Sequence, residues 1–339
     1  EVKQLPPGLL QRLCQLLTIV EQTGQWPSAL STGLITMIPK DEGDLRASKL
    51  RPISVMGVIY RGWAMARLPE LLEWQEGWAS EAICGFRPLF GCDDPIWQVG
   101  VEVEEASLFQ QPLHGMKIDL VKAFDKIPWS IVFPLAQAMG MSANILRALQ
   151  GMYQHLQRRF KLGCFVGEPF HSTNGVLQGC PASVILMNIM MQVWARVVNF
   201  TCPDMKARAY ADDASGTAAR VLDIIRALEI THQYCADTGM EMNLDKTHVW
   251  STSGEDRALF AQALQDTGIK VVQHERLLGA QMVYNRKRPA TTDIGNRWKD
   301  AELARQRVQA LPLSMTEKSF LAGAGAVPKL TFDSFVNPT

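Results

Sequence analysis

The sequence predicts an α+β fold, because patterns typical of helices and strands are mixed without a regular β-α-β alternation. The chain has 339 residues, of which 47% are hydrophobic and 20% are charged. This composition is typical of a globular protein and excludes a highly charged disordered chain. The 34 basic residues are balanced by 34 acidic ones, so any surface that binds phosphate has to be local.

Each element follows from periodicity and from the residues that end it. Apolar residues at helical spacing predict helices at 8–23, 52–74 with a break near Pro69, 128–140, 142–156, 182–198, 221–237 and from about 291 onward. Short runs of apolar and β-branched residues predict strands at 34–38 and 116–120, a hairpin within 158–171, a strand–turn–strand at 207–217 and two strands within 270–284. The polar residues 41–48 are expected to form a loop.

The most apolar helix, at 182–198, is expected to lie in the protein core. Its polar residues Asn188, Gln192 and Arg196 are spaced by four and share one face, which is typical of a buried amphipathic helix rather than a membrane span. The seven cysteines include no C-x-x-C pair, which argues against a disulfide framework or a structural zinc site and favours an intracellular protein. Residue 1 is Glu, so we expect a fragment of a longer polypeptide.

Two groups of carboxylates point to one site. Asp119 lies within an apolar strand, and Asp212 and Asp213 lie at a predicted hairpin turn. Taken singly, each has a plain structural interpretation, as a strand-end cap or a solvated turn. Taken together, acids on neighbouring strands are what a two-metal site needs, and hard oxygen ligands favour Mg²⁺.

Seven blocks then carry a resemblance, in which order and spacing both matter. They are Leu34–Lys40 with Arg51–Ser54, Gly85–Arg87 with Asp93–Asp94, Asp119–Asp125, Gly175–Ser183, Tyr210–Asp213, Gly239–Lys246 and Leu277–Gly279. With these blocks the chain resembles the reverse transcriptase domain of non-LTR, LINE-like retrotransposons. The resemblance implies a right-hand polymerase, with fingers at 1–115 and 141–175, a palm with an antiparallel sheet at 116–285, and the start of a thumb or connection at 286–339.

The resemblance also implies a catalytic centre. Asp119, Asp212, Asp213 and the carbonyl of Leu120 would bind two Mg²⁺ ions, with Mn²⁺ as the alternative ion. Lys246 would donate a proton to the departing pyrophosphate. The alternative for Lys246 is a solvated lysine after a turn.

A second group of residues is implied to hold the incoming nucleotide. Lys40 and Arg51 would contact its triphosphate, and Gln178 and Gly179 would lie where template and nucleotide meet. The ring of Phe124 would exclude a ribose 2′-hydroxyl and so select dNTPs. The alternatives are solvated surface charges for Lys40 and Arg51, a plain turn for Gln178 and Gly179, and an ordinary core aromatic for Phe124.

A third group would contact nucleic acid. Arg158, Arg159 and Lys161 form a small cluster suited to the template, and Leu278–Gly279 resembles the primer grip. Arg286, Lys287 and Arg288 open a basic stretch that would follow the phosphates of the primer–template duplex. An ordinary basic helix face is the alternative for this last stretch.

The function implied is that of an RNA-directed DNA polymerase, which adds dNTPs to a primer 3′-hydroxyl. Its partners would be an RNA template, a DNA or RNA primer, dNTPs and flanking domains of a longer polyprotein, with no membrane. An intracellular location is expected, with nucleus and cytoplasm left open. Two alternatives remain: an RNA-dependent RNA polymerase, against which Phe124 argues, and a catalytically inactive nucleic-acid-binding remnant of a retroelement.

Overall fold

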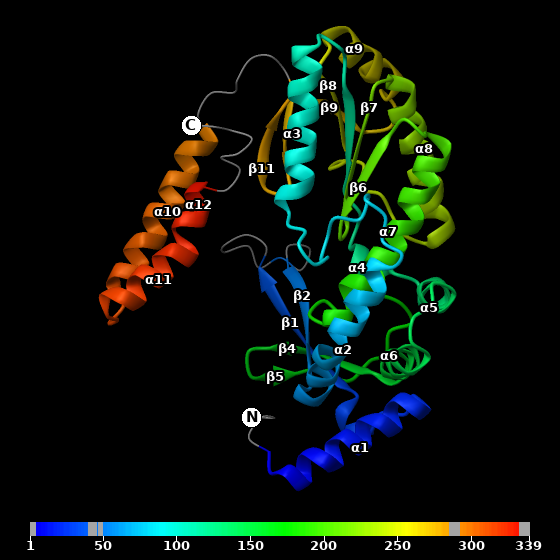
Figure 1. Cartoon of the computed structure of the whole chain (residues 1–339), viewed down its shortest axis with the longest axis vertical. Helices are drawn as coiled ribbons and strands as arrows, with labels where there is room; N and C mark the ends of the chain where they lie inside the picture. Colours follow the sequence, from blue (N-terminus) through cyan, green and yellow to red (C-terminus); the bar gives the residue numbers. More distant parts are fainter. Residues whose placement is uncertain (1–4, 40–45, 47–49, 285–291, 332–339) are drawn as a thin grey trace.

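The computed structural model describes residues 5–39, 46, 50–284 and 292–331. It contains a five-stranded sheet, a four-stranded sheet and a two-stranded hairpin, each packed with helices (Figure 1). Strands and helices do not alternate regularly along the chain, so the predicted α+β class is confirmed.

The five-stranded sheet has the order β6-β7-β3-β8-β9. Neighbouring strands are antiparallel, except for the parallel pair β8 and β9. The bounds are β3 His114–Ile118, β6 Lys206–Tyr210, β7 Asp213–Ala218, β8 His248–Ser251 and β9 Lys270–Val272. The central position of β3 places the chain that leaves its end at the middle of the sheet.

The two faces of this sheet are covered by different elements. Side chains alternate along β3, so Met116 and Ile118 point into the main hydrophobic core together with the buried faces of α7 Pro181–Thr201 and α8 Val221–Thr238. The opposite face is covered at one end by α3 Asp93–Leu108 and by the hairpin of β10 His274–Leu277 and β11 Ala280–Val283. These form a second, smaller core with Trp250.

A buried ion-pair network attaches α3 to this second face. Glu102 of α3 accepts hydrogen bonds from Arg208 of β6 and from the hydroxyl of Thr217 of β7, at 2.5 and 2.7 Å. The Arg208 side chain also contacts the amide oxygen of Gln98. Because the charges are paired and hydrogen-bonded, their burial is tolerated.

The four-stranded sheet has the order β2-β1-β4-β5 and lies below the larger sheet in Figure 1. Its strands are β1 Thr32–Pro39, β2 Leu50–Met56, β4 Gln157–Leu162 and β5 Phe165–Val166. Strands β4 and β5 are the hairpin predicted within 158–171. The helices around the two sheets are α1 Pro7–Thr23, η2 Ser28–Leu30, α2 Val58–Glu76, α4 Ala123–Lys126, α5 Trp129–Ala138, α6 Ala143–His155 and α9 Gly254–Ala263.

The prediction of helix over 52–74 was wrong at its start and at its break. Residues 50–56 pair along their whole length with β1, so strand pairing overrides their helical spacing. Helix α2 begins only after Gly57 and continues through Pro69. Pro69 cannot donate to the carbonyl of Met65, but that residue is 56% exposed, so water can take the place of the lost bond.

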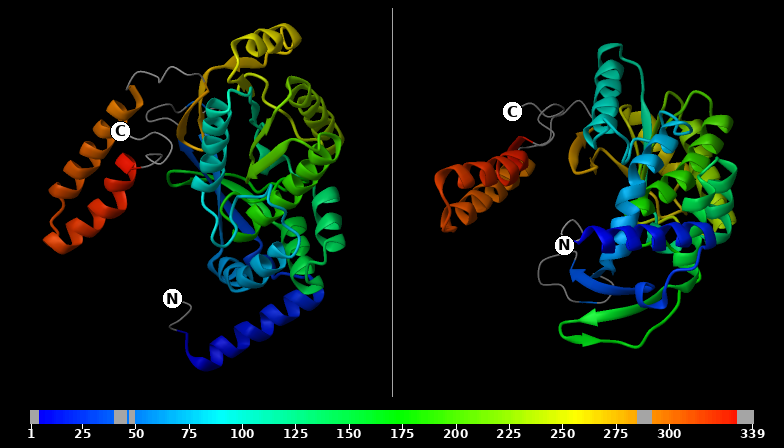
Figure 2. Two further views of the ribbon diagram at one scale, coloured as in Figure 1. Left: turned by 45° about the horizontal axis from the view of Figure 1, so that its top comes forward. Right: turned by 60° about the horizontal axis from the view of Figure 1, so that its bottom comes forward.

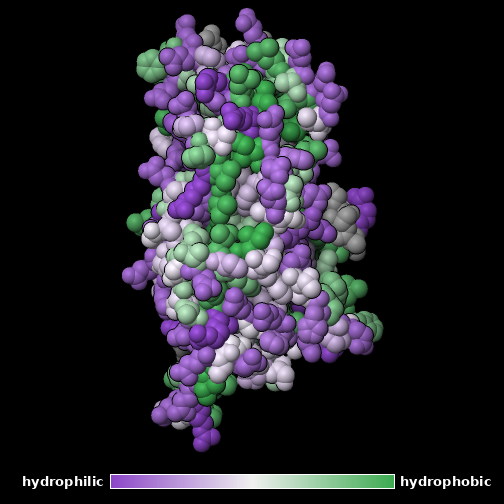
Figure 3. Space-filling view, turned by 90° about the vertical axis from the view of Figure 1, so that its right-hand side faces the viewer, coloured by the Kyte–Doolittle hydropathy of each residue, from purple (hydrophilic) through white to green (hydrophobic). Residues whose placement is uncertain are grey.

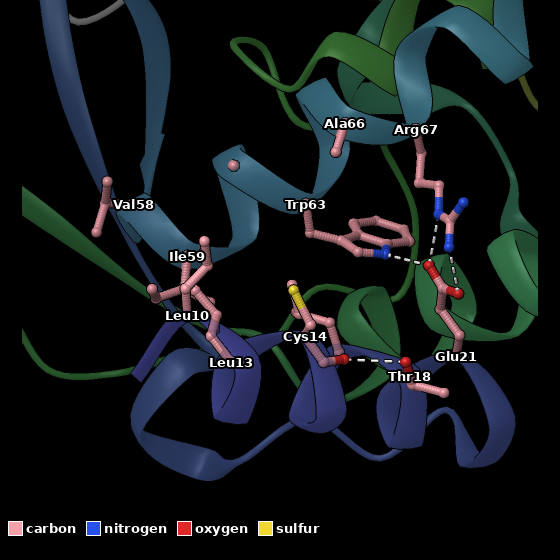
Figure 4. A pocket seen from close by; sticks show the side chains of 12 residues that line it. Leu10, Leu13, Cys14, Thr18, Glu21, Val58, Ile59, Trp63, Ala66 and Arg67 are labelled. Atoms are coloured by element: carbon pink, nitrogen blue, oxygen red, sulfur yellow. Dashed lines mark hydrogen bonds and ion pairs between the residues drawn. The ribbon is translucent and has the colours of Figure 1, made fainter. Parts of the chain in front are cut away.

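Helix α1 is attached to α2 by one buried carboxylate (Figure 4). Glu21 accepts hydrogen bonds from the indole N–H of Trp63 and from two nitrogens of Arg67, each at 2.7 Å. A pocket with a mostly apolar lining, including Leu10 and Ile59, opens beside this contact. On its other side α1 approaches α6, where Gly151 leaves room for the backbone of Gly24.

Helix α7 lies in the core, as predicted. Within the described residues it is the one helix whose length and composition would suit a membrane span, yet most of it is buried in the protein. Asn188 donates to Gln75 and to the carbonyl of Gly85, and Gln192 accepts from Ser80. These buried amides explain why polar residues recur on one face of an otherwise apolar helix.

Three helices follow the last strand: α10 Thr292–Ala310, α11 Met315–Gly325 and α12 Val327–Thr331. They pack on one another and stand apart from the two sheets in both views of Figure 2.

Figure 3 shows a band of hydrophobic residues along the side of the molecule on which α8 lies, between hydrophilic margins. Large apolar side chains are exposed on several elements, Leu222 of α8 among them.

Candidate active site

The turn between β6 and β7 carries two acids in a strained backbone. Tyr210 pairs with Asp213, so the turn consists of Ala211 and Asp212 alone. Ala211 has φ 54, in the left-handed region that a residue with a Cβ adopts only at a cost. Such a two-residue turn matches the twist of the strands, and here it places Asp212 at the end of the β6–β7 hairpin.

The segment Ala82–Arg87 supports this turn from outside the sheet. The amide of Cys84 donates to the carbonyl of Ala209 at 2.8 Å, and the amide of Ala209 donates to the carbonyl of Ala82 at 2.7 Å. A Cβ on Gly85 would lie 2.5 Å from the amide nitrogen of Ala211. Only glycine permits this approach, which explains why glycine stands at position 85.

Asp119 follows directly after β3 and is held by the 241–247 loop. The side-chain amide of Asn243 donates to Asp119 Oδ2 at 3.0 Å, and the Asn243 backbone amide donates to the Asp119 carbonyl at 2.8 Å. Lys246 Nζ lies 3.9 Å from the same carboxylate oxygen. Leu120 pairs with Met242, and neither of the two backbone bonds beside this bridge uses the Leu120 carbonyl.

The three carboxylates influence one another, although they come from distant parts of the sequence. Burial raises the pKa of Asp212 to about 6, with help from the negative charges of Asp213 and Asp119. Burial also raises the pKa of Asp213; the charge of Asp119 adds to this, and the charge of Lys117 opposes it. Repulsion between the acids thus adds to burial in disfavouring the ionised forms of Asp212 and Asp213.

A divalent cation fits this donor set. Carboxylate oxygens are hard ligands, and a cation would relieve the unfavourable charge at Asp212 and Asp213. Within the described residues, no three His, Cys, Asp or Glu side chains are already close enough to form a metal cluster. The acids are thus gathered in one region without being closed into a finished coordination shell.

The residues predicted to contact the nucleotide meet beside α4. The carbonyl of Phe124 accepts from the amide of Val176 at 2.7 Å, and the Phe124 ring is half-buried against the main core. The amide group of Gln178 lies 3.4 Å from both carboxylate oxygens of Asp125. This joins the 119–125 and 175–183 blocks, as their proposed shared role requires.

Gly179 and Arg51 connect this region to the four-stranded sheet. Gly179 has φ 118, and a Cβ there would lie 2.8 Å from the carbonyl oxygen of Ser54. The amide of Ser54 in turn donates to the carbonyl of Gln178 at 2.9 Å. Arg51 is exposed in β2, and its charge lowers the pKa of Asp212 slightly, against the effect of burial. Lys40 lies outside the described residues.

The three basic residues of β4 do not share one environment, which corrects the interpretation of Arg158. Arg158 is 9% exposed, because strand alternation places it on the same face as its partner Gly33, toward the core. Among the residues that the structure describes, its Nε and Nη2 atoms have no hydrogen-bond partner. Arg159 and Lys161 point to the opposite face, where they are more accessible.

Leu278 and Gly279 form the turn of the β10–β11 hairpin. Both have positive φ, 48 and 92, as a tight two-residue turn requires. The basic residues Arg286, Lys287 and Arg288 lie outside the described residues.

Two residues at the site were not singled out from the sequence. Asn243 lies within the Gly239–Lys246 block, and Lys117 lies two residues before Asp119. Asn243 orients the Asp119 carboxylate, and Lys117 acts on Asp213 through its charge. The alternation along β3 was the available signal for Lys117, since it places that lysine on the same face as Asp119.

Comparison with known protein families decides the assignment. The model of the family described as reverse transcriptase (RNA-dependent DNA polymerase) matches residues 38–282, which include Asp119, Asp212 and Asp213. The chain belongs to the reverse transcriptase family. The enzyme class predicted from the sequence is therefore confirmed, and the family as a whole uses divalent metal ions.

The relatives of this reverse transcriptase include retrotransposon proteins. It is 24% identical over 267 residues to the Retrovirus-related Pol polyprotein from type-2 retrotransposable element R2DM of Drosophila melanogaster, covering 75% of this chain and 24% of that one. It is 27% identical to the Transposon TX1 uncharacterized 149 kDa protein of Xenopus laevis, covering 69% and 18%. The non-LTR assignment is confirmed, and the chain spans about a quarter or less of these two relatives.

Solved structures show that the fold is that of reverse transcriptases. Telomerase from Candida Tropicalis in complex with a TWJ fragment of telomeric RNA matches 97% of this chain and 58% of that one, with a TM-score of 0.56 and 13% identity. The apo telomerase of the same organism matches 96% of this chain and 60% of that one, with a TM-score of 0.55 and 10% identity. The right-hand polymerase fold expected from the sequence is confirmed.

Proposed function

We propose that this reverse transcriptase domain extends a primer on an RNA template, adding dNTPs to the primer 3′-hydroxyl. The observation that carries the proposal is that Asp119 follows β3 beside β7, next to the turn with Asp212 and Asp213, and that the charges of Asp119 and Asp213 raise the pKa of Asp212. The family assignment supports the same chemistry. The work of the protein is then to position the primer end and the α-phosphate and to stabilise the charge that develops between them.

We further propose that Asp119, Asp212, Asp213 and the Leu120 carbonyl hold two Mg²⁺ ions, with Mn²⁺ as a substitute. When bound, these ions supply activation of the attacking hydroxyl and stabilisation of the leaving oxygen. Asn243 keeps the Asp119 carboxylate in one orientation. Lys246 lies beside that carboxylate and is proposed to protonate the departing pyrophosphate.

The nucleotide is proposed to lie between α4 and β2. Arg51 would contact its triphosphate as a guanidinium suited to phosphate oxygens, together with Lys40. Phe124 would exclude the ribose 2′-hydroxyl, and Gln178 and Gly179 would contact the templating region. The hydrogen bond between Ser54 and Gln178 supports this arrangement, since it holds β2 against the 175–183 segment.

The domains and partners follow from the same proposal. Residues 1–115 and 141–175 would serve as fingers, 116–285 as the palm and 286–339 as the start of the thumb or connection. Nucleic acid would lie along Arg159, Lys161, the hairpin turn at Leu278–Gly279 and the stretch Arg286–Arg288. Flanking domains of a longer polyprotein would complete the protein, and the seven unpaired thiols fit an intracellular location.

The test is primer extension on an RNA template with dNTPs and Mg²⁺, comparing the wild type with Asp212→Ala. We expect the wild type to extend the primer and Asp212→Ala to lose the activity. Equal extension by both proteins would refute the site assignment. Replacing the dNTPs with rNTPs separates this activity from that of an RNA-dependent RNA polymerase.

A catalytically inactive, nucleic-acid-binding remnant is the second candidate, because the even charge balance leaves no excess of basic charge to hold a duplex during extension. It predicts salt-dependent binding of the primer–template without extension by the wild type. A binding measurement on the same samples therefore decides between the two functions.

A further inference from the structure

Strand β3 places a lysine beside the proposed catalytic acids. Alternation along the strand puts Gly115, Lys117 and Asp119 on one face of the sheet. Lys117 pairs with Ser215 of β7 on one side and with His248 of β8 on the other. It therefore lies near the middle of the sheet, immediately behind Asp119.

The ammonium group of Lys117 contacts the β10–β11 hairpin. Lys117 Nζ donates a hydrogen bond of 2.7 Å to the carbonyl oxygen of Arg276. Arg276 lies in β10, two residues before the turn at Leu278. This bond joins the five-stranded sheet to the hairpin near its turn.

Lys117 also lies beside Asp213 in the sheet. Asp213 and Lys117 lie on the same face, because Lys117 pairs with Ser215, two residues along β7. Lys117 thus shares a sheet face with a proposed metal-binding acid and contacts the backbone of the hairpin.

The base of the hairpin is attached separately. The ring of Tyr284 stacks on that of Trp250 with 3.8 Å between centroids, and its hydroxyl donates to Glu275 at 2.8 Å. Glu275 also lies 3.4 Å from His248. Gly115 makes room for this stack, since a Cβ there would lie 2.3 Å from the Trp250 ring. Apolar contacts hold the hairpin along its length, with Leu277 and Leu278 near the turn, and Lys117 adds a hydrogen bond at this end.

We propose that Lys117 is a positioning residue, which holds the β10–β11 hairpin at a constant distance from Asp213. This inference rests on the proposed function, in which a primer end held by the hairpin would stay aligned with the catalytic acids. The attachment of the hairpin itself can be measured without any activity.

The experiment compares Lys117→Met, Lys117→Arg and a matched control, Lys206→Met. Lys206 lies on β6 of the same sheet and makes a surface ion pair of 2.9 Å with Glu102. Hydrogen–deuterium exchange of residues 274–283 in EDTA reports the attachment of the hairpin. Steady-state extension reports kcat and separate KM values for primer–template and dNTP.

We expect Lys117→Met to speed exchange in 274–283 and to raise the KM for primer–template about tenfold, as loss of a charged hydrogen bond would, with a smaller change in the KM for dNTP. Lys117→Arg should restore both values, and Lys206→Met should leave both unchanged. Should Lys117→Met fail to fold, Lys117→Gln, which keeps a neutral donor, takes its place in the same comparison.

Exchange and KM values equal to those of Lys206→Met would overturn the inference. If the wild type extends no primer, the proposed function fails, and the exchange data alone then decide the attachment. Faster exchange in Lys117→Met would still support it, and unchanged exchange would reject it.

Discussion

Asp212 occupies a position that is unfavourable for its own charge. It is largely buried, and the charges of Asp213 and Asp119 add to the cost of ionising it. Partial relief comes from backbone hydrogen bonding and from the positive charge of Arg51. A site of this kind lowers the stability of the cation-free protein and raises its affinity for a cation.

This arrangement predicts an unusual pH dependence. The pKa of Asp212 is raised from an ordinary 3.8 to about 6, so the folded state binds the proton more tightly than the unfolded state does. The resulting stability is complete below the ordinary pKa and is lost as the pH rises through about 6. In EDTA at about pH 8, Asp212→Asn should therefore be more stable than the wild type by about 1–2 kcal/mol.

Urea denaturation at several pH values measures this difference, which should disappear near pH 4 because the wild-type acid is then protonated too. Adding Mg²⁺ at about pH 8 should stabilise the wild type and not Asp212→Asn. A variant less stable than the wild type at high pH would contradict the electrostatic argument.

Phe124 is predicted to control sugar selection. Its ring is half-buried against the core, so Phe124→Val removes bulk at one side of the proposed nucleotide site. We expect the ratio of kcat/KM for dNTP over rNTP to fall at least about tenfold, since a steric clash is removed. Stability should fall by about 1–2 kcal/mol from the lost packing. An unchanged ratio would make Phe124 an ordinary core aromatic.

At the level of the element, the β6–β7 turn depends on a segment that is remote in sequence. Gly85 lies against Ala211, whose positive φ is otherwise costly, and the ring of Phe86 lies 5.7 Å from that of Tyr210. The turn carries Asp212, so its geometry determines where a proposed catalytic acid points. The 82–87 segment therefore belongs to the site, although it supplies no ligand.

Gly85→Ala should displace this turn. The added Cβ would meet backbone atoms of Tyr210 and Ala211, which cannot rotate away, so we expect a loss of about 1–3 kcal/mol in stability. Primer extension should fall more than about tenfold, because misplacement of a catalytic group is costly. Gly62→Ala is the matched control, since nothing lies within 4 Å of its Cβ. Equal activity of the two variants would show that the turn holds its shape without Gly85.

At the level of the whole molecule, α1 is joined to the rest by a few directed contacts. Glu21 is buried and accepts from Trp63 and Arg67, while Arg147 donates to its carbonyl. In Figure 1, α1 lies below the four-stranded sheet, whereas β6 and β7 lie above it. Stability and catalysis should therefore respond separately to changes here.

Glu21→Ala should lower the free energy of unfolding by about 2 kcal/mol, because it leaves the Trp63 indole and the Arg67 guanidinium without their acceptor. Glu70→Ala removes only an exposed partner of Arg67, at 3.3 Å, and should cost less than about 0.5 kcal/mol. Chemical denaturation measures both. A large drop in kcat/KM for dNTP in folded Glu21→Ala would show that α1 does affect the site.

Much of the local structure followed from the sequence alone. Periodicity indicated the helices around 8–23 and 221–237 and the hairpin at 207–217, since each buries one face against a single core. The order of the blocks identified the family, because its characteristic motifs are short runs of contiguous residues such as Tyr210–Asp213. Helix α3 and strand β2 were missed, because long-range pairing and packing override local patterns.

Only the tertiary structure decided which side chains meet. Asn243 and Lys117 are polar residues like many others in the sequence, and they belong to the site because antiparallel pairing brings β7, β3 and the 241–247 loop together. Arg158 is the opposite case: its charge suggested a place on the surface, but the pairing of β4 with β1 places its side chain toward the core. Residue type and hydrophobic periodicity can be read from a short stretch of sequence. The burial of a side chain and its distance from others are set only when segments far apart in sequence pack against each other.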